Sequence, residues 1–127
     1  MVAYACAIEN GDAHLKNFSV IYENADAPIS LAPAYDLVST TPYQARDTLA
    51  LTLHGTKQFP DRKTLLGFVR TITGRNEKSA AQLVDQAIYG ARAASKIAKQ
   101  YREKHPDAKR FSEVMIEGIS RGISRLN

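Results

Sequence analysis

The sequence has little of what stabilises small secreted or metal-bound domains. It contains one cysteine, Cys6, and no tryptophan. A single cysteine cannot form an intramolecular disulfide or a cysteine-rich zinc site, which excludes a disulfide-stabilised fold and indicates a cytoplasmic protein. No stretch approaches the roughly 18 consecutive apolar residues of a membrane-spanning helix. No basic residue precedes the apolar start of the chain, so we expect neither a targeting signal nor membrane association.

The composition is otherwise that of a folded domain. Hydrophobic residues make up 44% of the chain and charged residues 24%, values close to globular averages and far from those of disordered chains. A length of 127 residues suits one hydrophobic core, so we expect residues 1–127 to form one domain. Because no basic residue lies close to Cys6 in the sequence, we expect it to be a small buried hydrophobe rather than a nucleophile.

The net charge of +4 is unevenly distributed. Residues 1–60 carry three basic and six acidic side chains, a net charge of −3, whereas residues 61–127 carry 14 basic and seven acidic side chains, a net charge of +7. A basic half can bind nucleic acid or an acidic partner. Amphipathic helices also expose charged faces that contact only water, and we favour that interpretation. Direct binding of nucleic acid is therefore not expected.

The front half of the chain predicts short elements. Residues 1–8 are rich in alanine and predict the last turns of a helix, which Glu9-Asn10-Gly11 would end. A β-branched and aromatic run over residues 18–23 and a short apolar run over residues 29–32 flank the turn-forming sequence of residues 24–28, which predicts a β-hairpin within residues 18–33. Alternating threonine and leucine predict one more short strand or an extended segment over residues 48–53.

The second half, residues 61–127, predicts helices. Residues 61–74 begin with a good N-cap, end with glycine and carry one apolar face. Apolar residues at three- and four-residue spacing predict a long helix over residues 76–104. A last amphipathic helix begins near Ser112, with Asp107 or Ser112 as its cap. The predicted fold is α+β and mostly helical, with a short hairpin near the N-terminus followed by a helical bundle.

Residues 10–17 (NGDAHLKN) form the densest polar cluster. The Asp12 carboxylate can accept a proton, and the Asn17 amide oxygen can bind a hard cation. His14 and Lys16 can offer donors to phosphate oxygens. These residue types could form a phosphate and metal site, and the alternative is an ordinary polar turn.

Asp36 lies a few residues beyond the predicted hairpin. Because an antiparallel hairpin returns the chain to its starting end, we expect Asp36 to lie close to Asn17. An amide oxygen and a carboxylate suit Mg²⁺, which prefers oxygen ligands and keeps several waters. Asp12, five residues before Asn17, would then be free to orient a hydroxyl nucleophile.

These residues match a known pattern. The order Asp-x-His-x-x-Asn at Asp12, His14 and Asn17, followed by Asp36, resembles the catalytic loop and metal-binding aspartate of protein-kinase-like phosphotransferases. More narrowly, NGDAHLKNFS followed by LAPAYDLVST resembles the HipA family of bacterial serine/threonine kinase toxins. The resemblance covers residues 10–40, and the helical pattern beyond it is compatible with a kinase-like C-terminal lobe.

The resemblance implies the chemistry. Asp12 would be the catalytic base or hydroxyl-orienting carboxylate, and Asn17 and Asp36 would bind Mg²⁺. The reaction would be Mg-ATP phosphoryl transfer to a protein hydroxyl, with ATP and Mg²⁺ as cofactors. The resemblance also divides the lower kinase lobe into a catalytic loop (residues 10–17), a hairpin (18–33), a metal-binding segment (33–40) and a helical part (61–127).

Three further residues receive roles from the same resemblance. His14 takes a position where eukaryotic protein kinases usually have lysine, so it would contact phosphate or brace the loop. Lys16 would neutralise phosphate charge, and Tyr35 would line the nucleotide pocket. All three are interpreted as cofactor-binding residues.

Kinase-like folds hold ATP between two lobes, and the upper lobe precedes the catalytic loop. Only eleven residues precede Asp12, and no glycine pattern matches a phosphate-binding loop. We therefore expect a C-terminal piece of a longer kinase that is inactive without the missing N-terminal lobe. The family further implies a DNA-binding antitoxin of the HipB type as partner and an aminoacyl-tRNA synthetase as protein substrate.

Two other functions remain open. The chain could be a non-catalytic helical interaction module that binds a protein or nucleic acid through residues 92–110. It could also be a small-molecule phosphotransferase of the aminoglycoside-kinase type, because the Asp-x-His-x-x-Asn order occurs there too. The joint presence of Asp12, Asn17 and Asp36 favours a kinase over a decayed relic.

Overall fold

Four α-helices and one short hairpin make up the regular structure, which a computed structural model describes for residues 1–127. This confirms the predicted α+β, mostly helical fold. In chain order the elements are α1 (Val2–Ala7), the 3₁₀ turn η1 (Leu15–Asn17), β1 (Val20–Ile21), β2 (Ser30–Leu31), α2 (Arg62–Thr73), α3 (Glu77–Lys104), the 3₁₀ turn η2 (Pro106–Ala108) and α4 (Lys109–Leu126).

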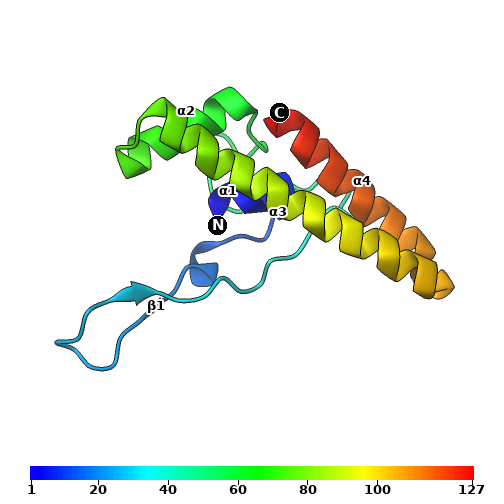
Figure 1. Ribbon diagram of the computed structural model, residues 1–127, viewed down its shortest axis with the longest axis horizontal. Helices are drawn as coiled ribbons and strands as arrows, with labels where there is room; N and C mark the ends of the chain where they lie inside the picture. The colour runs from blue at the N-terminus through cyan, green and yellow to red at the C-terminus, as the bar shows by residue number, and fades with distance from the viewer.

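The long helices form the body of the molecule. α3 and α4 lie side by side along most of their length, and α1 packs against both (Figure 1). The core gathers where these helices meet α2, and its fully buried side chains include Cys6, Leu65, Val84 and Leu126. The amphipathic pattern of the second half thus buries one face of each helix, as predicted.

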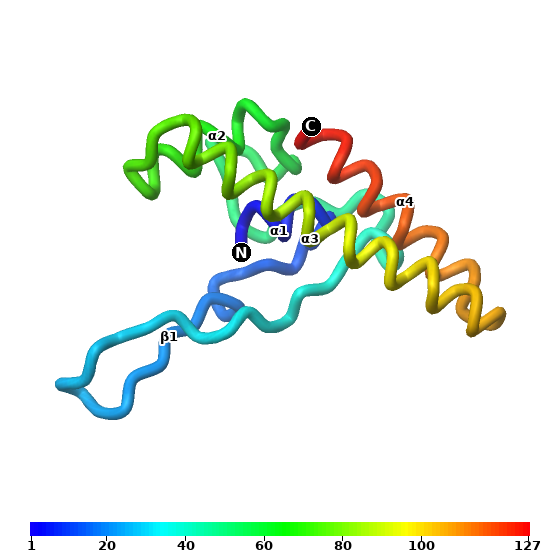
Figure 2. Tube along the Cα trace, in the orientation of Figure 1, coloured from blue at the N-terminus to red at the C-terminus, as the bar shows by residue number.

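The hairpin projects away from this body (Figure 1). Val20 pairs with Leu31 and Ile21 with Ser30, antiparallel, and all four side chains are exposed. The chain leaves α1, runs out to the hairpin and returns past the helices before it reaches α2 (Figure 2). The hairpin therefore confirms the predicted return of the chain, with a paired region shorter than the apolar runs suggested.

α1 and α4 approach each other very closely at Gly122. A Cβ atom added there would lie 2.9 Å from the Cys6 carbonyl oxygen and would overlap the Ala7 carbonyl oxygen. Glycine is therefore required for this contact. The close approach places α4 beside the end of α1, where the polar loop begins.

The predicted start and end of α2 are confirmed. The Asp61 carboxylate accepts a hydrogen bond from the Thr64 N–H at 2.8 Å, and Gly74 ends the helix in the left-handed conformation, with φ of 65°. Asn76 caps α3 in the same way, through the Ser79 N–H at 2.9 Å. Local capping chemistry thus sets three of the helix boundaries in the second half.

Two local elements differ from what the sequence favoured. Residues 48–53 form no strand, because the only pairing there is an isolated bridge between Leu53 and Thr56 and no neighbouring strand extends it. Leu49 and Leu53 instead bury their side chains in the helical core. Leu51, between them, is 39% exposed, so this irregular segment buries only two of its three leucines.

The start of the last helix also differs from the prediction. α4 begins at Lys109 rather than near Ser112, and Ala108 precedes it without a side-chain cap. The short turn η2, with Pro106 at its first position, leads directly into the helix, so Asp107 caps nothing and Ser112 lies buried inside α4. No helix of the structure combines the length and apolarity needed to span a membrane.

Candidate active site

Asn17 and Asp36, which are 19 residues apart, meet at the base of the hairpin. The Asn17 amide nitrogen donates to a carboxylate oxygen, Oδ2, of Asp36 at 2.6 Å. The Asn17 oxygen, Oδ1, accepts from the His14 N–H at 2.9 Å. Asn17 is buried, whereas Asp36 is exposed. The two contacts fix the orientation of the amide, and they bring together the pair that the hairpin argument placed side by side.

The segments around this pair are also tied together. η1 places Asn17 so that its side chain folds back onto the N-terminus of its own turn. The Asn10 amide nitrogen donates to the backbone oxygen of Asp36 at 3.3 Å. Asp36 itself has a positive φ of 54°, which is uncommon for a residue with a side chain. Two loop residues, Asn10 and Asn17, thus hold Asp36 against the loop.

Asp12 is exposed, and Asn10 links it to this pair. Its N–H donates to the Asn10 side-chain oxygen at 3.0 Å, so Asn10 contacts both Asp12 and Asp36. The carboxylate of Asp12 lines an open cavity of about 350 Å³. The other residues lining this cavity are Gly11, Thr40, Tyr43, Gln44 and Asp47.

His14 and Lys16 lie in the loop, and Tyr35 lies in the segment that returns from the hairpin. The Tyr35 hydroxyl donates to the Lys16 backbone oxygen, and it lies 2.6 Å from the Ser19 hydroxyl. Tyr35 therefore braces η1 from the returning chain. The Lys16 side chain is exposed and forms no ion pair, and His14 is half-buried with its Nδ1 atom unpaired.

The donor set suits a hard divalent cation. No group of three or more His, Cys, Asp and Glu side chains could hold a metal in this structure. The available ligands are the Asp36 Oδ1 atom, which accepts no hydrogen bond from the protein, and the second lone pair of the Asn17 oxygen. Two such oxygens, completed by water and phosphate oxygens, form the kind of site that Mg²⁺ prefers. The residues present therefore fit a magnesium ion.

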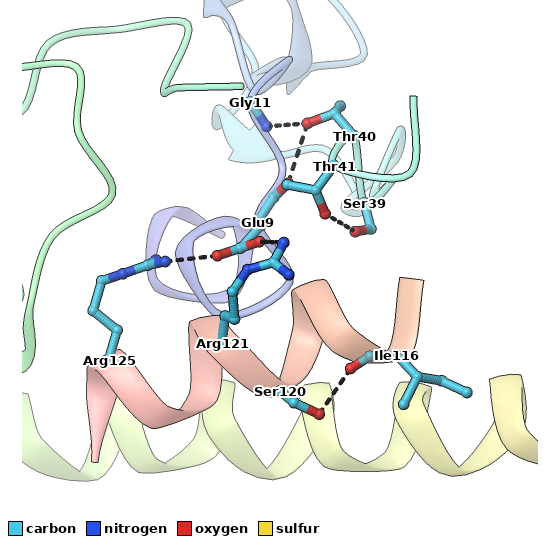
Figure 3. A network of polar contacts seen from close by, with 9 residues as sticks. All are labelled: Glu9, Gly11, Ser39, Thr40, Thr41, Ile116, Ser120, Arg121 and Arg125. Atoms are coloured by element: carbon cyan, nitrogen blue, oxygen red, sulfur yellow. Dashed lines mark hydrogen bonds and ion pairs between the residues drawn. The ribbon is translucent and has the colours of Figure 1, made fainter. Parts of the chain in front are cut away.

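Sequence reasoning missed Glu9, which lies directly before the loop. Its carboxylate is 3% exposed and forms ion pairs with Arg121 at 2.9 Å and Arg125 at 2.6 Å (Figure 3). Its backbone oxygen accepts from the Thr40 N–H at 3.2 Å and from the Thr40 hydroxyl at 3.1 Å. Two arginines four residues apart share one helix face, which was the available signal.

Cys6 has no part in the site. It is fully buried, which confirms the prediction of a small core residue. Burial raises the pKa of its thiol to about 12. The thiol is therefore protonated and unreactive at neutral pH.

Residues 1–113 match the family model described as the HipA-like C-terminal domain. The chain belongs to this family. Its HipA-like domain includes Asp12, Asn17 and Asp36 within the matched range, whereas Arg121 and Arg125 of α4 lie beyond it.

Two curated proteins are similar to the HipA-like domain. One, named "Putative kinase Y4dM", from Sinorhizobium fredii, is 48% identical over 58 residues, which is 45% of this chain and 14% of that protein. Another, named "Putative kinase", from Haemophilus influenzae, is 50% identical over 42 residues, 33% of this chain and 12% of that protein. The matched stretches thus span about an eighth of these relatives, and they establish a relationship to kinases.

Proposed function

We propose that this HipA-like domain supplies the metal-binding and hydroxyl-orienting residues for transfer of the ATP γ-phosphoryl group to a serine or threonine hydroxyl of a protein. The contact of 2.6 Å between Asn17 and Asp36 carries the proposal. A bound magnesium ion supplies charge neutralisation at the phosphates. Phosphoryl transfer depends on positioning and electrostatics, so two preset oxygen ligands are what this chemistry needs from the protein.

Asp12 orients the acceptor hydroxyl in this proposal. Its carboxylate is exposed on an open cavity, and its backbone is fixed through Asn10. A hydroxyl that enters the cavity can donate its hydrogen to the carboxylate, which accepts the proton as the oxygen becomes a nucleophile. The same Asn10 side chain contacts the Asp36 backbone, so the acceptor and metal positions are set relative to one another.

The neighbouring residues have supporting roles. The exposed Lys16 ammonium attracts the nucleotide phosphates, because no carboxylate of the protein pairs with it. Tyr35 is 43% exposed and offers its ring to the nucleotide, while its hydroxyl holds η1 in place. His14 braces the loop through its backbone N–H, which bonds to the Asn17 side chain.

Catalysis needs a phosphate-covering lobe in addition to these residues. We propose that an N-terminal kinase lobe supplies it, since no glycine-rich loop of this sequence fits that role. The resemblance to HipA kinases supports two further proposals: a DNA-binding antitoxin of the HipB type as partner, and an aminoacyl-tRNA synthetase as the phosphoacceptor. Detectable ATP-dependent phosphorylation by residues 1–127 alone would refute the requirement for an added lobe.

The metal assignment is tested with Mn²⁺, a paramagnetic substitute for Mg²⁺. Titration into the ¹⁵N-labelled chain is expected to broaden the amide signals of Asn17 and Asp36 before others. Asp36→Asn removes the charged ligand and is expected to abolish this selectivity. Asp26→Asn is the matched control, because it makes the same change at an exposed position of the hairpin turn.

Selective broadening that survives Asp36→Asn, or that occurs elsewhere in the chain, would overturn the metal assignment. Calorimetric titration of ATP with Mg²⁺ then measures nucleotide binding in the same variants. Binding that depends on Mg²⁺ and is lost in Asp36→Asn is the expected result. Binding of equal strength in Asp36→Asn would contradict the proposal.

A further inference from the structure

We propose that Glu9 is a positioning residue for the catalytic loop, and that Arg121 and Arg125 of α4 hold it in place. This proposal rests on the proposed function, because it assigns Glu9 a role in setting Asp12 relative to Asp36. The three side chains are named here the Glu9 clamp. The clamp connects α4, the last helix of the chain, with the segments that carry Asp12 and Asp36.

The Glu9 carboxylate is enclosed and fully paired (Figure 3). Its side chain is 3% exposed, whereas those of Arg121 and Arg125 are 50% and 29% exposed. Each carboxylate oxygen accepts a hydrogen bond from one guanidinium group, from Arg121 at 2.9 Å and from Arg125 at 2.6 Å. The Arg125 guanidinium also lies 5.4 Å above the centre of the Phe59 ring. The carboxylate therefore has one well-defined position, set from α4.

The Glu9 backbone needs such support. Its φ is 53°, in the left-handed region that residues with side chains rarely adopt. Such a conformation persists where the surroundings hold it, and such residues cluster at functional sites. Here it turns the chain sharply at the end of α1 and directs Asn10 to Asp12 toward the hairpin. The ion pairs to α4 stabilise that turn.

Hydrogen bonds connect the Glu9 backbone with the segment that holds Asp12 and the segment that holds Asp36. The Glu9 carbonyl oxygen accepts from the Thr40 backbone and hydroxyl, and the Thr40 hydroxyl oxygen accepts from the Gly11 N–H at 2.9 Å (Figure 3). Gly11 adjoins Asp12, and Thr40 is four residues beyond Asp36. A shift of Glu9 therefore disturbs the hydroxyl-orienting and the metal-binding residue together.

If the clamp only stabilised the fold, its variants would affect the whole domain rather than the loop alone. A buried ion pair contributes little net stability compared with apolar residues of similar volume, because desolvation offsets the attraction. Such a pair can also fix a unique geometry, and in this proposal the fixed geometry is that of the loop. The structure therefore predicts a local effect of clamp variants, confined to the residues that Thr40 and Glu9 connect.

Hydrogen exchange measures that local effect directly. In Arg121→Gln, the amides of Gly11 and Thr40 are expected to exchange at least about tenfold faster, while amides in α2 and α3 keep their rates. Arg121 is half exposed and Arg125 still pairs with Glu9, so this variant retains the fold. Arg121→Lys keeps the charge and is expected to restore most of the protection.

Arg70→Gln is the matched control. Arg70 is 53% exposed and pairs with Glu77 at 3.8 Å on the surface, far along the chain from the loop. Its loss is expected to leave the exchange of Gly11 and Thr40 unchanged. Unchanged loop amides in Arg121→Gln, or equal acceleration throughout α2, α3 and the loop, would overturn the clamp.

Mn²⁺ broadening then distinguishes positioning from local stability. Arg121→Gln is expected to require about three- to tenfold more Mn²⁺ for the same broadening at Asn17 and Asp36. Faster exchange with unchanged Mn²⁺ affinity would overturn the positioning role. If the wild-type chain shows no selective broadening, the proposed metal site fails, and the exchange comparison still decides whether the clamp orders the loop.

Discussion

Replacement of Gly122 by alanine tests the contact that sets α4 beside the polar loop of residues 10–17. The added Cβ atom would overlap the Ala7 carbonyl oxygen and lie 2.9 Å from the Ala7 carbonyl carbon and the Cys6 carbonyl oxygen. These obstacles are backbone atoms, so no side-chain rotation can relieve the overlap. α1 and α4 would have to separate, and the Glu9 clamp lies at that same junction.

Two opposing effects determine how much Gly122→Ala changes the free energy of unfolding. Alanine favours a helix by up to about 1 kcal/mol relative to glycine. Overpacking costs about 1–3 kcal/mol, and the upper end applies where the backbone must move. We therefore expect Gly122→Ala to lower the free energy of unfolding by about 2 kcal/mol. For a chain of this size, that corresponds to a fall in Tm of about 8 °C.

Gly67→Ala provides the matched control. Gly67 lies inside α2, and a Cβ there would meet only His54 Nε2, at 3.9 Å, which is an ordinary contact. This variant is expected to be more stable than the wild type by up to about 1 kcal/mol. Urea unfolding followed by circular dichroism measures both. Equal or increased stability of Gly122→Ala would refute the close packing of α1 on α4.

Three further predictions concern stability. Burial raises the pKa of the Cys6 thiol to about 12 from an ordinary value of 9.0, so the contribution of the protonated thiol to the free energy of unfolding is complete below pH 9 and is lost as pH rises toward 12. In urea unfolding, the stability advantage of the wild type over Cys6→Ala should therefore fall across that range. A constant difference would contradict burial of the thiol. The hydrogen bond from the Thr64 N–H lowers the pKa of Asp61, so the contribution of the ionised carboxylate to stability is present above the ordinary value of 3.8 and is lost as pH falls through the lowered pKa. The ¹³C chemical shift of the Asp61 carboxyl group should show titration below pH 3.8. Titration at pH 3.8 would exclude the cap. Asn76→Ala should lower the free energy of unfolding by about 1 kcal/mol in the same urea assay, and an unchanged value would show that the Ser79 N–H finds another partner.

The parts of the structure that follow local rules could be predicted. Caps and apolar spacing set the boundaries of α2 and α3, because Asp61, Gly74 and Asn76 act within one turn of their own position. The closeness of Asn17 and Asp36 also followed, because a hairpin necessarily returns the chain to its start.

Other parts depend on contacts between distant segments. The burial of Leu49 and Leu53 follows from the helices they meet, and no property of the segment itself distinguishes that burial from a strand. The Glu9 clamp joins residues more than 110 positions apart, and sequence spacing alone gives no measure of such a contact. The role of the Tyr35 hydroxyl in bracing η1 was missed for the same reason.

The sequence by itself determined the helical class of this protein, the hairpin and the residue types from which a magnesium site could be built. These features depend on local propensity and on a short loop closure, so neighbouring residues specify them. Only the tertiary structure decided how the loop is oriented. The left-handed turn at Glu9 is followed by ion pairs of its carboxylate with Arg121 and Arg125, and α4 comes close enough to form them because Gly122 has no side chain.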